Sequence, residues 1–102
     1  MLKTFRKVEP FITLNDFLSK ARVVERFTSS SGRRYLVTGI EDDKMVFRRL
    51  DAKESKEWSM NLKNVFKAYQ ELEDFATINF KPFVPITHSP ARGLLLHLGM
   101  LQ

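Results

Sequence analysis

The chain has 102 residues, a formal net charge of +5 at pH 7 and no cysteine. This length predicts one domain spanning residues 1–102, and the 43% of hydrophobic residues predicts a folded core rather than disorder. The lack of cysteine excludes disulfides, a thiol nucleophile and cysteine-based metal sites, and it favours a reducing compartment. Because no apolar run approaches the roughly 20 residues of a membrane span, we expect a cytoplasmic protein without a membrane partner.

The first predicted helix lies within residues 12–22. Thr13 suits its N-cap position, and Asp16 places a carboxylate near the positive end of the helix. The apolar residues that follow recur with the spacing of one helix face, and these are Leu14, Phe17, Leu18 and Ala21. The pattern predicts a short amphipathic helix that buries one stripe.

Strand-type residues then follow in short runs separated by turn residues. Runs rich in β-branched and aromatic residues occur at 23–28, 33–40, 45–50 and, more briefly, 57–60. Between them, the Ser-Ser-Ser-Gly segment and the acidic segment 41–44 have turn composition. Consecutive strands joined by such short connections predict an antiparallel meander.

Two further helices are predicted after the strands. Asn61 suits the N-cap of the first, whose apolar stripe consists of Leu62, Val65, Phe66, Tyr69 and Leu72. Residues 75–87 combine strand-type residues with two prolines, which predicts an edge strand before Pro82 and an extended loop after it. The last helix is predicted to begin with Ser89 as N-cap and to end at Gly99.

The order of these elements predicts an α+β fold. In it, an antiparallel meander of four to five strands packs with an N-terminal, a middle and a C-terminal helix. The sequence contains no internal repeat, no low-complexity tract and no interdomain linker, which agrees with a single domain.

Few residues in the chain suit catalysis. The only histidines are His88 and His97, and there is no cysteine, so a nucleophile–base pair and a tetrahedral metal site lack their usual side chains. The glycines are isolated from one another, which excludes the usual phosphate-binding loops. We therefore predict no enzymatic activity, no cofactor and no metal.

Several arginines are predicted to gather at one end of the sheet. With Asp42 and Asp43 at a hairpin tip, the numbers of paired residues would sum to 85, so that Leu36 faces Arg49. The sheet end away from the acidic tip would then hold Arg33, Arg34, Arg48 and Arg49. With Tyr35 available for stacking, this cluster favours contact with a phosphate backbone.

A competing interpretation is that these arginines only form surface ion pairs. Glu25 and Glu57 would then face them across the strands, and Arg26 would be one more flanking charge. Such pairs contribute little net stability and imply no ligand.

Two weaker sites are predicted in the C-terminal segment. Ser89 and Arg92 open the last helix, where free N–H groups and the helix dipole favour an anion, although capping alone would explain Ser89. The same helix is apolar nearly all round, so Leu96 and Met100 are predicted to project away from the core and to form a homodimer contact. The alternative is burial of the whole helix within its own domain.

The favoured function is a non-enzymatic binding module that contacts a nucleic-acid backbone or another polyanion through the basic end of its sheet. The alternative is a protein-interaction or homodimerisation domain that uses the apolar C-terminal helix. A third class, an enzyme or ligand carrier around His88, Ser89 and Arg92, would require a pocket at the start of the last helix.

Overall fold

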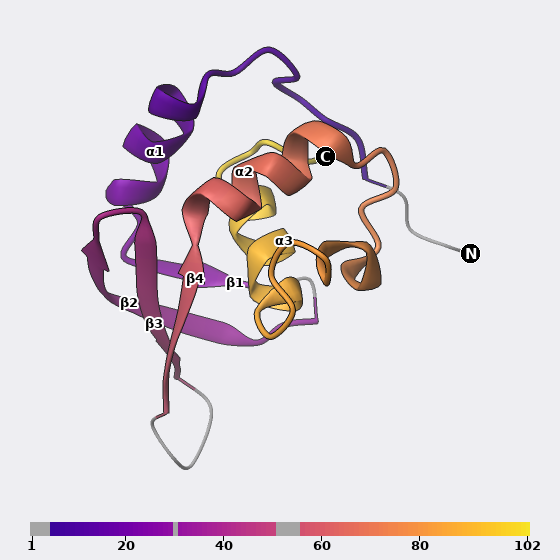
Figure 1. The fold of residues 1–102 in the computed structure, drawn as a ribbon. Coiled ribbons are helices and arrows are strands. Elements are labelled where there is room, and N and C mark those ends of the chain that lie inside the picture. The colour runs from indigo at the N-terminus through magenta and orange to yellow at the C-terminus, as the bar shows by residue number, and fades with distance from the viewer. Residues whose placement is uncertain (1–4, 30, 51–55) are drawn as a thin grey trace.

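Four antiparallel strands, arranged in sequence order, form the sheet of the computed structural model, which describes residues 5–29, 31–50 and 56–102 (Figure 1). In chain order the elements are α1 (Leu14–Arg22), β1 (Arg26–Thr28), β2 (Arg34–Glu41), β3 (Lys44–Arg49), β4 (Glu57–Asn61), α2 (Leu62–Glu71), the 3₁₀ helix η1 (Thr77–Phe80) and α3 (His88–His97). α2 continues directly from β4, and α3 lies against β1 and η1. The predicted α+β fold, a meander packed with three helices, is confirmed.

Both of the first two α-helices begin at the predicted caps. The Thr13 hydroxyl accepts a hydrogen bond from the backbone N–H of Asp16 at 3.1 Å. The Asn61 side chain likewise accepts hydrogen bonds from the first turn of α2, at 2.9 and 3.2 Å. These bonds satisfy N–H groups that have no partner within the helix, which is why a short polar residue defines each start.

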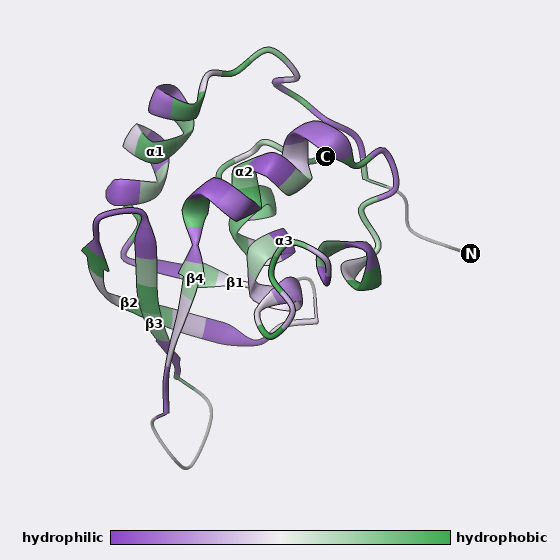
Figure 2. Cartoon of the chain, in the orientation of Figure 1, coloured by the Kyte–Doolittle hydropathy of each residue, from purple (hydrophilic) through white to green (hydrophobic). Residues whose placement is uncertain are grey.

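The inner face of the sheet, which carries Phe27, Tyr35 and Phe47, is buried. The rings of Phe27 and Tyr35 stack with centroids 5.1 Å apart, and Phe47 contacts them edge-on at 5.6 and 5.4 Å. α3 mixes polar residues with the hydrophobic run Leu94, Leu95 and Leu96, and α2 alternates between hydrophilic and hydrophobic positions (Figure 2). The aromatic residues of the strands are therefore part of the core.

α3 approaches β1 so closely that the contact requires a glycine. A Cβ atom at Gly93 would lie 2.8 Å from the Cα of Ser29 and 3.1 Å from the carbonyl oxygen of Thr28. Gly93 is buried, and the atoms opposite it belong to the backbone. The position of α3 on the sheet thus depends on the absence of a side chain here.

The hairpin between β2 and β3 contains a β-bulge at Thr38. Next to the tip, the predicted register is correct, with Ile40 opposite Met45. Beyond Thr38 the register shifts by one residue, so that Leu36 lies opposite Arg48 rather than Arg49. The predicted pairing is wrong in this half of the hairpin, because an extra residue on one strand changes every later pair.

The predicted edge strand between residues 75 and 80 does not form. Its second half is η1, and the turn before η1 is held by Asp74, whose carboxylate accepts from the N–H of Ala76 at 3.0 Å. The backbone oxygen of Asp74 accepts from the Asn79 amide at 2.9 Å. Phe75 and Phe80 are buried, so the apolar residues of this segment serve as core residues of a turn and a 3₁₀ helix.

The segment before α1 pairs with the C-terminal segment. Arg6 and Gln102 exchange backbone hydrogen bonds of 2.8 and 2.9 Å, and the N–H of Val8 donates to the carbonyl oxygen of Met100 at 2.9 Å. This pattern is a short antiparallel contact between segments from opposite ends of the described chain.

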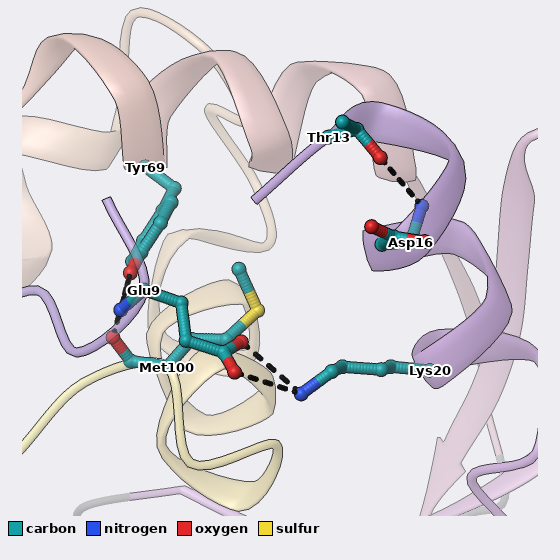
Figure 3. A network of polar contacts seen from close by, with 6 residues as sticks. All are labelled: Glu9, Thr13, Asp16, Lys20, Tyr69 and Met100. Carbon is teal, nitrogen blue, oxygen red and sulfur yellow. Dashed lines mark hydrogen bonds and ion pairs between the residues drawn. The ribbon is translucent and has the colours of Figure 1, made fainter. Parts of the chain in front are cut away.

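Tyr69 of α2 joins this contact to the helices (Figure 3). Its hydroxyl donates to the carbonyl oxygen of Met100 at 2.9 Å and accepts from the N–H of Glu9 at 3.0 Å. The carboxylate of Glu9 in turn forms an ion pair of 3.1 Å with Lys20 of α1. Burial raises the pKa of the Tyr69 hydroxyl above its usual value, so the hydroxyl stays protonated and keeps its role as donor.

Candidate nucleic-acid interface

Three arginines lie on the outer face of the sheet, opposite the aromatic core. Leu36 of β2 lies between Arg26 of β1 and Arg48 of β3, because paired residues share a face. Arg34 is two residues before Leu36 on β2 and therefore faces the same side. These outer arginines, Arg26, Arg34 and Arg48, are exposed, and Leu36 is half-buried among them.

Among the described residues, the outer arginines form no ion pair of the kind that the competing interpretation, a cross-strand ladder, requires. Within the described residues, the ion pairs are Glu9–Lys20 and Asp43–Lys63, and the outer arginines take no part in either. Glu57 lies opposite Arg48, but its carboxylate accepts a hydrogen bond of 2.8 Å from the hydroxyl of Thr38. Of the residues that the structure describes, Glu57 is the acid that lies opposite an outer arginine across a strand pair, and its carboxylate hydrogen-bonds to the bulge residue, while the outer arginines are exposed to solvent.

The other predicted residues of the basic cluster lie elsewhere. Arg33 is exposed just before β2, in a turn where its backbone N–H donates to the Ser29 hydroxyl at 3.2 Å. Arg49 lies opposite Tyr35, half-buried at the rim of the inner face. Tyr35 is only 3% exposed and stacks on Phe27, so the prediction that it is available for stacking on a ligand is wrong. The bulge causes this, because the shifted register pairs Tyr35 with Arg49 and puts both on the inner face.

Arg34 and Arg48 were among the residues predicted to bind a polyanion, whereas Arg26 was expected only as a flanking charge. The sequence could have placed Arg26 on the outer face, because the alternation Arg-Phe-Thr in a short strand predicts an outward Arg and an inward Phe.

Comparison of the chain with protein families, curated proteins and solved structures gives no match. The outer arginines are therefore interpreted from their own chemistry.

The predicted anion site at the last helix is not assembled. α3 begins at His88 after Thr87, so Ser89 lies inside the first turn and is not the N-cap. Arg92 donates from Nη1 to the carbonyl oxygen of Phe75 at 3.3 Å, and its guanidinium lies 5.1 Å from the ring centroid of Phe5. Desolvation lowers the pKa of Arg92 from its usual value, which agrees with a guanidinium packed against the protein.

Of the two residues predicted to form a dimer contact, Leu96 and Met100, only Leu96 is partly accessible. Met100 is fully buried, because the chain reverses at Gly99, with φ at 74°, and returns Met100 and Leu101 to the core. The prediction that Met100 projects outward is wrong. Leu96 is half-buried and packs at the edge of the core.

The structure also bears on metal binding, on membrane insertion and on a ligand pocket near the last helix. Among the described residues, none of the His, Asp and Glu side chains gather in groups of three or more that could hold a metal ion. Within the same part of the chain, no helix has the length and apolarity to cross a membrane. A shallow depression near the start of α3 is lined by residues 59–61, 64 and 83–87, and His88, Ser89 and Arg92 do not line it.

Proposed function

We propose that this chain is a non-enzymatic binding module whose outer sheet face binds a polyanion, with a nucleic-acid backbone as the leading ligand. The observation that supports this most is the placement of the outer arginines, which surround Leu36 with no ion pair to any described acid. A guanidinium group presents a planar set of donors that matches phosphate geometry. Exposed guanidinium groups on one face can meet several phosphates at once.

The ligand class follows from charge and exposure. The net charge of +5 favours polyanions in general, and the outer arginines concentrate part of that charge on a single face. A nucleic-acid ligand also suits the reducing compartment that the lack of cysteine favours. The alternative, a homodimer through the C-terminal helix, is less favoured because Met100 is buried within its own chain.

The test compares two double variants with the same loss of charge. Arg34→Gln with Arg48→Gln removes two outer arginines, and Lys67→Gln with Lys81→Gln removes two exposed lysines outside the sheet. We expect the arginine variant to lose retention on heparin at about 50 mM salt, where phosphate-type contacts are strong. The lysine variant should remain close to wild type.

A variant at Arg49, which was also predicted to bind a polyanion, gives a further comparison. Because Arg49 lies at the rim of the inner face, Arg49→Gln should weaken retention less than Arg48→Gln does. Circular dichroism should be unchanged in the variants at Arg34 and Arg48, since both residues are exposed. The proposal fails if the wild-type chain is not retained, or if the lysine and arginine variants lose retention equally.

A further inference from the structure

We infer that the ligand of the outer face is a nucleic-acid duplex, contacted through its phosphates, rather than a single strand held by its bases. This inference rests on the proposed function and names the form of the polyanion. It follows from what the outer face contains, how wide the sheet is and how its charges are spaced.

In the described part of the chain, the outer face offers no aromatic ring to a base. Phe27, Tyr35 and Phe47 are buried in the core on the inner face. Trp58 of β4 lies opposite Phe47 in the register and therefore shares the inner face as well. Around the outer arginines the strand positions are occupied by Thr28, Leu36, Val46, Glu57 and Ser59. Proteins that bind single strands without sequence preference combine positive charge with stacking on aromatic side chains, and this face supplies only the charge.

The width of the sheet excludes entry into a groove. Four strands span three spacings of about 4.8 Å, so the sheet is roughly 14 Å across before its side chains are counted. The major groove of B-DNA is about 12 Å wide and admits a helix or a two-stranded ribbon. A four-stranded face therefore lies across the groove and reaches the phosphates on its two sides, which carry no sequence information.

The spacing of the charges agrees with two rows of phosphates. Arg26 and Arg48 lie on either side of β2, two strand spacings or about 10 Å apart, and Arg34 extends from the strand between them. This separation approaches the width of a major groove, so the flanking arginines can contact opposite backbones. A flexible single strand offers one row of phosphates and would engage fewer of the three charges at once.

The experiment measures affinity by fluorescence anisotropy for two short DNA duplexes of unrelated sequence and for their separated strands. We expect both duplexes to bind equally and more tightly than any of the strands. With three phosphate contacts, the salt slope should be about −2.7, so the duplex affinity should fall about 40-fold between about 50 and 200 mM salt. Arg34→Gln should reduce this loss to about 12-fold, as expected for one contact fewer, whereas Lys67→Gln should leave it unchanged.

A variant that adds an aromatic residue to the outer face tests why duplexes are expected to bind more tightly than single strands. Leu36→Tyr places a ring among the outer arginines on a strand where tyrosine is a favourable residue. It should raise the affinity for single strands at least about fivefold, which is the smallest gain in affinity expected from stacking one base on an aromatic ring. An unchanged affinity would show that the missing aromatic residue is not what disfavours single strands.

The measurements distinguish a failure of the duplex inference from a failure of the proposed function. If single strands bind as tightly as duplexes, or if the two duplexes differ markedly, the inference of a duplex backbone is wrong while retention on heparin still supports a polyanion site. If the chain binds neither heparin nor any of the oligonucleotides at about 50 mM salt, where such contacts are strong, the proposed function and this inference both fall.

Discussion

Removal of a single oxygen atom at Tyr69 should destabilise the whole chain. In Tyr69→Phe the ring keeps its place in the core, where Tyr69 is 1% exposed. The variant loses the bond that the hydroxyl accepts from the N–H of Glu9 and the bond that it donates to the carbonyl oxygen of Met100. These two bonds connect α2 to both of the paired end segments.

The size of the effect follows from which group is left without a partner. The oxygen of Met100 still accepts a hydrogen bond from the N–H of Val8 at 2.9 Å, so it remains satisfied. The N–H of Glu9 loses its partner at a half-buried position, and an unsatisfied donor of this kind costs about 1–3 kcal/mol. We therefore expect the free energy of unfolding to fall by about 2 kcal/mol and Tm to fall by about 8–16 °C.

Thermal and urea denaturation followed by circular dichroism measure this change. Ser19→Ala removes an exposed hydroxyl from α1 and serves as the control, which should stay within about 0.5 kcal/mol of wild type. The urea m-value should not change, since the folded core is kept. If Tyr69→Phe is as stable as the control, the Tyr69 hydroxyl does not hold the end segments as described.

Three further predictions concern the core, the closest helix contact and alkaline pH. Phe66→Ala should lower the free energy of unfolding by about 3–5 kcal/mol, because Phe66 is 6% exposed and packs within the core. The neighbouring Lys67→Ala should be near neutral. Equal melting temperatures of the two variants would show that the buried face of α2 is wrongly assigned. Gly93→Ala should destabilise by about 1–2 kcal/mol, because the overlap with the Ser29 backbone outweighs the helix preference of alanine, and a stabilised variant would show that α3 can move away from β1. The raised pKa of Tyr69 contributes stability that is full below about pH 10 and is lost as the pH rises through the folded-state pKa; a pH series of urea unfolding should show this loss in wild type and a smaller loss in Tyr69→Phe.

The features that the sequence predicted correctly depend on neighbouring residues. Thr13 and Asn61 were identifiable as caps because a cap acts on N–H groups two or three positions away. The strands followed from runs of β-branched and aromatic residues, and the meander followed from the short turns between them. The sequence also identified Arg34 and Arg48 as candidate binding residues, although from a register that was correct only near the hairpin tip.

The features that it missed depend on long-range packing. A bulge at Thr38 leaves no clear pattern in the sequence, yet it decides which residues share a face with Tyr35. The strand-type residues near Phe75 could equally fill a core from a turn, because burial requires apolar side chains and not a particular backbone conformation. Met100 was predicted to be exposed because the helix pattern was continued past Gly99, where the chain actually reverses.

The pairing of the two end segments has a consequence for the order of folding. Arg6 and Gln102 are separated by nearly the whole chain, so their hydrogen bonds can form only after the sheet and helices have brought both ends together. Contacts between such distant residues carry a large loop-closure cost and slow the folding of small domains. We expect the end segments to join last and to separate first, so that amide hydrogen exchange at Val8 and Gln102 reports an opening that precedes global unfolding.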